Sequence, residues 1–103
     1  MVAATLSLAQ EIGRYWAELI QAEPAAERLW VRAARDYVEL WLLAAPTVDD
    51  EIEMRLYEAA NRVHDRFPHA YVRFHVLNPR HYRDGAVHST VPADATEIAL
   101  RPA

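Results

Sequence analysis

The order of secondary structure is clearest in residues 37–77, YVELWLLAAPTVDDEIEMRLYEAANRVHDRFPHAYVRFHVL. Residues 49–66 carry apolar side chains at helical spacing, with acidic residues in the first turn, where they suit the positive end of a helix dipole. Thr47 is the expected N-cap, and Phe67-Pro68 is expected to end this helix. Residues 37–43 and 71–77 alternate and are rich in strand-favouring types. Strand, helix and strand over this length are typical of a βαβ unit.

The two ends of the chain predict one helix and one edge strand. Ser7 with Gln10 three residues later has the spacing of a capping box, and apolar residues follow at helical spacing until about residue 21. Residues 96–101 alternate, which predicts an edge strand that Pro102 closes. Between them, Asp84-Gly85 is a turn signal, and residues 86–91 are expected to form a short extended piece.

Residues 27–45 allow two interpretations. As a helix, this stretch has its polar residues gathered on one side, and the chain would form three helices followed by a small C-terminal sheet. As a hairpin, residues 28–33 and 37–43 pair around a short turn at 34–36. We favour the hairpin, because a lone strand after three helices would have little to pair with.

The favoured fold is a single α+β domain over residues 1–103, a two-layer sandwich in α-β-β-α-β-β order. Two helices would cover one face of a four-stranded sheet, and 103 residues suit one domain. The face toward the helices is expected to carry Leu29, Val31, Val38, Leu40, Leu42, Val72, Phe74, Val76, Ile98 and Leu100.

Composition sets further bounds. The chain has no cysteine, which excludes disulfides, thiolate metal sites and a cysteine nucleophile. Its basic residues are all arginine, which is expected of a GC-rich, bacterial genome. No signal peptide is recognisable at the N-terminus, and no apolar run is long enough to cross a bilayer, so a cytoplasmic protein is expected.

The opposite sheet face carries large aromatic side chains and arginines where polar residues are expected. Such a face is typical of an interface, since aromatic residues and arginine are enriched where proteins meet. The expected partner is a second copy, sheet against sheet, with a different protein as an alternative, and Trp41→Glu is expected to break the dimer. A nucleic acid is disfavoured by the net charge of −4 and by the lack of an RNA-binding motif. The expected interface residues are Trp30, Arg32, Tyr37, Trp41, Tyr71, Arg73 and His75.

A second hypothesis concerns the loop at residues 78–85, in which Arg80, His81 and Arg83, with Arg73, could hold an anion. It would make the chain a small ligand-binding protein or enzyme. The simpler alternative, in which this loop is an ordinary polar turn, is favoured.

Neither a metal nor a cofactor is expected. The five histidines form no H-x-H or H-E-x-x-H motif, and His75, His81 and His88 would be the ligands if a metal bound. His88 and Ser89 would point in opposite directions on an extended segment, so they do not suggest a nucleophile and its base. We therefore expect a regulatory or accessory protein without catalytic activity.

Overall fold

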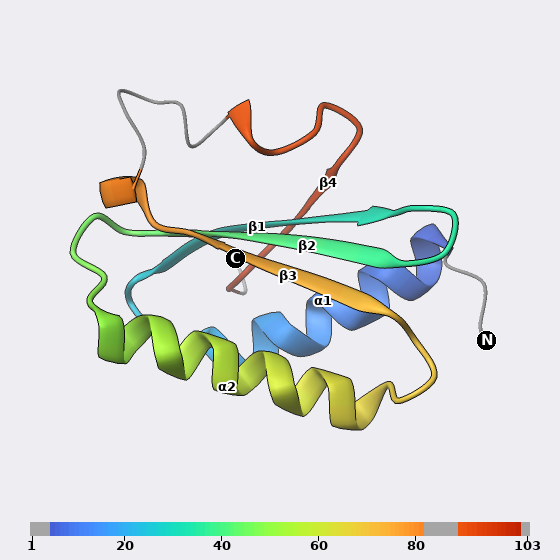
Figure 1. Cartoon of the computed structure of the whole chain (residues 1–103), viewed down its shortest axis with the longest axis horizontal. Coiled ribbons are helices and arrows are strands. Elements are labelled where there is room, and N and C mark those ends of the chain that lie inside the picture. Colours follow the sequence, from blue (N-terminus) through green and yellow to red (C-terminus); the bar gives the residue numbers. More distant parts are fainter. Residues whose placement is uncertain (1–4, 82–88, 102–103) are drawn as a thin grey trace.

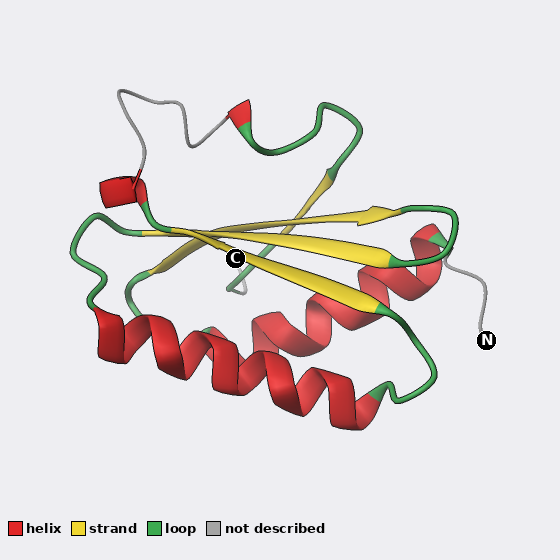
Figure 2. Cartoon of the chain, viewed as in Figure 1, coloured by secondary structure: helices red, strands yellow, loops and turns green. Residues whose placement is uncertain are grey.

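The computed structural model of the chain describes residues 5–81 and 89–101. In chain order the elements are α1 (Leu6–Ile20), β1 (Ala26–Ala33), β2 (Val38–Ala44), α2 (Asp50–Arg66), β3 (Val72–Leu77), the short 3-10 helix η1 (Pro79–His81) and β4 (Thr96–Ile98). Figure 2 shows the two helices beneath one face of the sheet. The predicted α+β class and element order are confirmed.

Both helices are capped by a residue other than the predicted one. The Thr5 hydroxyl accepts the backbone N–H of Leu8 at 3.0 Å, so α1 starts before Ser7. The Asp49 carboxylate accepts the N–H of Ile52 at 2.8 Å, and this replaces Thr47 as the cap of α2. Each true cap lies three residues before its donor, the spacing an N-cap requires. The predicted end of α1 at residue 21 is confirmed, because Gln21 is its C-cap.

The hairpin interpretation of residues 27–45 is confirmed. β1 and β2 pair antiparallel. Ala33 lies opposite Val38 beside the turn and Ala26 lies opposite Ala44 at the other end, with one register shift between Ala26 and Arg28. β2 and β3 pair in parallel, and β4 pairs antiparallel with β1, which gives the strand order β3-β2-β1-β4. Residues 82–88, which include the predicted Asp84-Gly85 turn and half of the predicted extended piece, lie outside the described residues, and residues 89–91 are not a strand. Pro102 also lies outside them.

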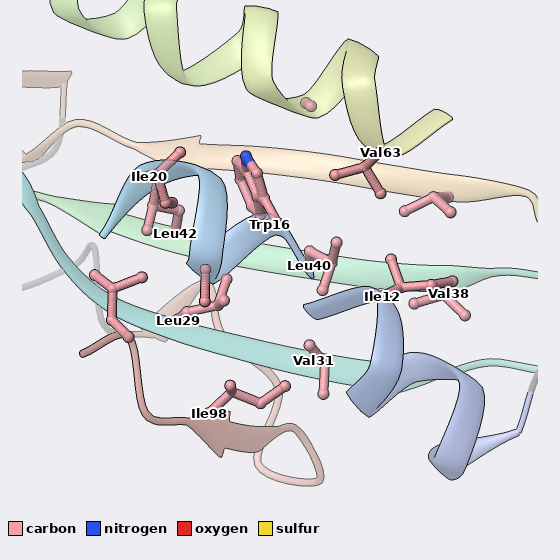
Figure 3. Close-up of a cluster of buried hydrophobic side chains, with 14 of the residues drawn as sticks. Ile12, Trp16, Ile20, Leu29, Val31, Val38, Leu40, Leu42, Val63 and Ile98 are labelled. Carbon is pink, nitrogen blue, oxygen red and sulfur yellow. The ribbon is translucent and has the colours of Figure 1, made fainter. Parts of the chain in front are cut away.

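The main core lies between the helices and one face of the sheet. Figure 3 shows α1 side chains and inward residues of the strands meeting in this layer. Trp16 is fully buried there, and its indole N–H donates to the carbonyl of Leu56 on α2 at 3.3 Å. Gly13 lets α1 approach the sheet closely, since a Cβ at this position would lie 2.5 Å from Val31 Cγ1 and 2.6 Å from Ile98 Cδ1. The ten core positions predicted on the strands pack in this layer.

Neither helix in the described residues combines the length and apolar character that a membrane-spanning helix needs.

Candidate interaction surface

The outer face of the sheet is the one away from the helices. Because side chains alternate along a strand, it carries Trp30 and Arg32 from β1, Glu39, Trp41 and Leu43 from β2, Arg73, His75 and Leu77 from β3, and Glu97 from β4. Tyr37 and Tyr71, which directly precede β2 and β3, contact Arg73 on the same side. All seven predicted interface residues therefore lie on one face.

One half of this face is covered by the chain itself. Trp41, Leu43 and Leu77 are buried, and Val91 and Ala95 pack against them. β3 and β4 form opposite edges of the sheet, and residues 89–95, which lead into β4, lie on the side of the sheet away from the helices (Figure 1). We call the region around these three residues the covered half. The expectation that the whole face awaits a partner is therefore wrong, and the error follows from the topology of this connection.

The burial of Trp41 also changes the meaning of the expected dimer-breaking variant. Trp41 is only 4% exposed, so a glutamate at this position would place an unpaired charge in the covered half. Loss of a dimer in Trp41→Glu would report on folding rather than on contact between copies.

The remaining part, which we call the open half, is organised around Glu39. One oxygen of this carboxylate lies 2.6 Å from Nε2 of His75, and the other accepts from Nη2 of Arg32 at 3.4 Å. The Glu39 side chain is only 12% exposed. A carboxylate this deep in a surface needs such partners, because burial of an unpaired charge is costly. Glu39 thus binds neighbours in its own chain.

Aromatic rings and cations are stacked across the outer face. The Arg73 guanidinium lies 4.3 Å from the centre of the Tyr37 ring and 5.7 Å from that of Tyr71. The His75 ring stacks on Trp41 with centroids 5.5 Å apart and 14° between the planes. These contacts hold the Arg73 guanidinium and the His75 ring in place before any partner arrives, which lowers the entropy lost on binding.

Tyr71 and Arg73 are the most accessible part of the open half. Tyr71 is 59% exposed, one of the few large apolar side chains so exposed in the described residues. Arg73 is also exposed, and no carboxylate contacts it among the ion pairs of the described residues. Its positive charge is therefore offered outward beside an exposed ring.

At the β4 edge, Arg28 and Glu97 form a bidentate ion pair with contacts of 2.9 and 2.7 Å. These hydrogen bonds lower the pKa of Glu97 and raise that of Arg28, since each stabilises the charged form of its partner. The Arg28 guanidinium also lies 4.7 Å from the centre of the Trp30 ring. The charges at this edge are thus already matched within the chain.

The residues of the anion-site hypothesis do not come together. Arg73 lies near the start of β3, whereas Arg80 and His81 belong to η1, beyond the end of that strand. The backbone N–H of Arg80 is held by the side-chain oxygen of Asn78 at 3.0 Å, and both Arg80 and His81 are exposed. Arg83 lies outside the described residues.

The described residues also bear on the possibility of a metal site. Residues 5–81 and 89–101 contain no group of three or more histidine, cysteine, aspartate or glutamate side chains placed to hold a metal ion. His75 instead pairs with Glu39, and His88 lies outside the described residues.

Two features of this surface had only weak signals in the sequence. The covering segment contains Val91 and Ala95, which lie near Pro92 and among small and polar residues and show no clear period. Asn78 is 1% exposed, and its buried side-chain nitrogen has no hydrogen-bond partner in residues 5–81 and 89–101. A single asparagine before a proline predicts only a turn, so the sequence gives no signal that Asn78 is buried.

Comparison of the chain with protein-family models, with curated proteins and with solved structures finds no match. The functional argument therefore rests on the geometry of this surface.

Proposed function

We propose that this chain is a small cytoplasmic interaction module without catalytic activity, which assembles as a homodimer and has a regulatory or accessory role. The contact would involve the open half of the outer face. The observation that carries the proposal is the cluster of Tyr71, Arg73 and Tyr37, in which the guanidinium lies over both rings and Tyr71 and Arg73 are exposed. Tyrosine and arginine dominate the binding energy of many protein interfaces.

The balance of charge favours a protein partner over a nucleic acid. Arg28, Arg32 and Arg73 share the outer face with Glu39 and Glu97, and Asp94 lies 3.7 Å from Arg32. A phosphate backbone would meet these carboxylates as well as the arginines, and nucleic-acid sites are strongly positive. A mixed surface of this kind can instead complement another mixed surface, including its own copy.

The arrangement of the basic loop residues favours a binding module over an enzyme. A catalytic or anion-binding site needs its polar groups to converge on one reacting or bound group. Here Arg73 is engaged with two tyrosines and His75 with Glu39, while Arg80 and His81 lie past the other end of β3.

The proposal is tested by the solution mass of the purified protein, measured by light scattering over a range of concentrations. A homodimer has twice the chain mass of 11.8 kDa. Arg73→Glu reverses the one outward charge of the cluster and is expected to raise the dissociation constant by about tenfold to a hundredfold, the effect of losing a central interface arginine.

The matched control is Arg62→Glu, the same charge change at an exposed position on α2. It should leave the dimer mass unchanged, and both variants should keep the circular dichroism of the unchanged chain. A monomer at every concentration up to the millimolar range would refute the homodimer.

A further inference from the structure

The two edges of the sheet differ in how much they offer to another strand. β4 has three residues, and its Glu97 forms an ion pair with Arg28 of β1. β3 has six residues, pairs with β2 through all six without a register shift, and contains no proline. In the residues that the structure describes, β3 pairs with β2 alone. Long, regular edges without proline or bulges are the ones that accept a further strand.

One hydrogen bond establishes which backbone groups of β3 face outward. The N–H of Val38 donates to the carbonyl of Tyr71 at 2.9 Å. In a parallel pair, alternate residues of a strand bond to the same neighbour, so Arg73, His75 and Leu77 direct their backbone groups toward β2. The N–H and C=O groups of Val72, Phe74 and Val76 therefore point to the free edge.

Apolar side chains line this same edge. Phe74 and Val76 are only partly buried, although they belong to the core layer. The His64 ring of α2 meets the Phe74 ring with centroids 5.1 Å apart. Tyr57 lies seven residues before His64, hence on the same flank of α2, and is 40% exposed. An exposed tyrosine on the helix thus accompanies the open backbone of the strand.

We propose that two copies of this chain associate through β3, antiparallel across a twofold axis that passes beside Phe74. Phe74 would then face Phe74 of the second copy, and Val72 would face Val76. Each of these residues has its backbone groups at the free edge, so all of them enter the ladder, with about six hydrogen bonds in total. Because directly opposed residues share a face, apolar side chains meet apolar side chains in the core layer.

Pairing of the two β3 strands would also join the outer faces of the two copies into one continuous surface. Arg73 would lie opposite His75 of the second copy, and Tyr71 opposite Leu77. The exposed Tyr71 ring would then lie beside the segment that covers the partner's outer face, which would bury it. The twofold axis closes the assembly, so the edge is consumed without further growth. This inference rests on the proposed homodimer and specifies its geometry.

The geometry can be tested by disulfide formation, because the chain contains no cysteine of its own. Arg73→Cys and His75→Cys are purified separately, mixed and oxidised. In the proposed register these positions form a pair without hydrogen bonds, with Cα atoms about 4.5 Å apart, within disulfide reach. Each variant alone places its two cysteines diagonally, about 7–8 Å apart, where a disulfide does not form without movement of the backbone.

The expected result is a covalent dimer in the mixture and little in either single variant. A mixture containing Arg62→Cys, exposed on α2, measures cross-linking by random collision. Equal cross-linking in all samples would overturn the proposed register.

Hydrogen exchange of the unsubstituted protein gives a second test, which does not depend on any substitution. The amides of Arg73, His75 and Leu77 are protected by β2 in every case. Those of Val72, Phe74 and Val76 should be protected only in the edge-paired dimer, and dilution should speed their exchange by at least about tenfold. A dimer mass with fast exchange at these three amides would overturn edge pairing while leaving the homodimer standing. A monomeric mass would overturn both.

Discussion

The two faces of the sheet are built on different principles. The face toward the helices is apolar, and most of its residues are buried, five of them completely: Leu29, Val31, Val38, Leu40 and Leu42. The outer face mixes charges with aromatic rings, and Val91 and Ala95 pack against its buried residues Trp41, Leu43 and Leu77. The first face is satisfied by burial alone, because apolar surface needs only removal from water. The second needs specific partners for each charge, so its stability depends on geometry.

This contrast is sharpest between two tryptophans. Trp16 is fully buried between α1, α2 and the sheet, and its N–H has a partner. Trp30 lies on the outer face, is partly exposed, and has Arg28 over its ring. The same residue type therefore serves once as core and once as surface cover.

The largest effect is expected from Trp16→Ala. Loss of the ring leaves a cavity and removes the hydrogen bond from the indole to the Leu56 carbonyl, so the free energy of unfolding should fall by about 3–5 kcal/mol. Trp30→Ala should lower it by less than about 2 kcal/mol. Urea titration followed by circular dichroism measures both. Equal losses in the two variants would contradict the distinction between the faces.

A smaller effect is expected from Glu39→Gln, which keeps the volume but removes the charge. Arg32 would keep the 3.7 Å contact to Asp94, and its buried Nε has no hydrogen-bond partner among the described residues. We expect a loss of about 1–2 kcal/mol, the usual cost of removing a hydrogen bond to a charged group in a partly exposed site. A loss that vanishes in the Arg32→Met background would confirm the coupling, whereas an unchanged loss would refute it.

The smallest effect is expected from Glu97→Gln at the β4 edge. The pKa of Glu97 is lower in the folded chain than in the unfolded one, because Arg28 hydrogen-bonds its charged form. The stability it contributes is therefore present above the unfolded pKa and is lost as the pH falls through the folded pKa. Both groups are largely exposed, so Glu97→Gln should reduce the acid sensitivity of unfolding only slightly. Thermal unfolding at pH 7 and pH 3 measures this, and a steeper acid dependence in the variant would contradict it.

The features that could be predicted from the sequence are those with a local pattern of apolar residues. The helix at 50–66, the strand at 72–77 and the assignment of side chains to the two faces all depend on local periodicity, which apolar spacing makes visible. The helix starts were placed two residues away from the true caps, because several neighbouring residues can cap and local sequence does not choose among them. The hairpin at 26–44 was favoured by considering its partners in the sheet rather than its own pattern.

Contacts between residues distant in the chain had no comparable signal. Leu77 and Trp41 are buried by a segment whose own residues show no period, because the route from β3 to β4 depends on the strand order. The partners of Glu39 likewise depend on the register of β1 and β3 beside β2.

Local periodicity, together with the need of each strand for a partner, was therefore sufficient to predict the class of fold, the core positions on the strands and the location of the aromatic and arginine residues on one face. Which part of that face is covered by the described residues, which strands form the edges of the sheet and which charges pair with each other were established by long-range pairing. The physical reason is that burial follows hydrophobicity, which each residue carries with it, whereas hydrogen bonds and ion pairs require two groups that the chain brings together only when it folds.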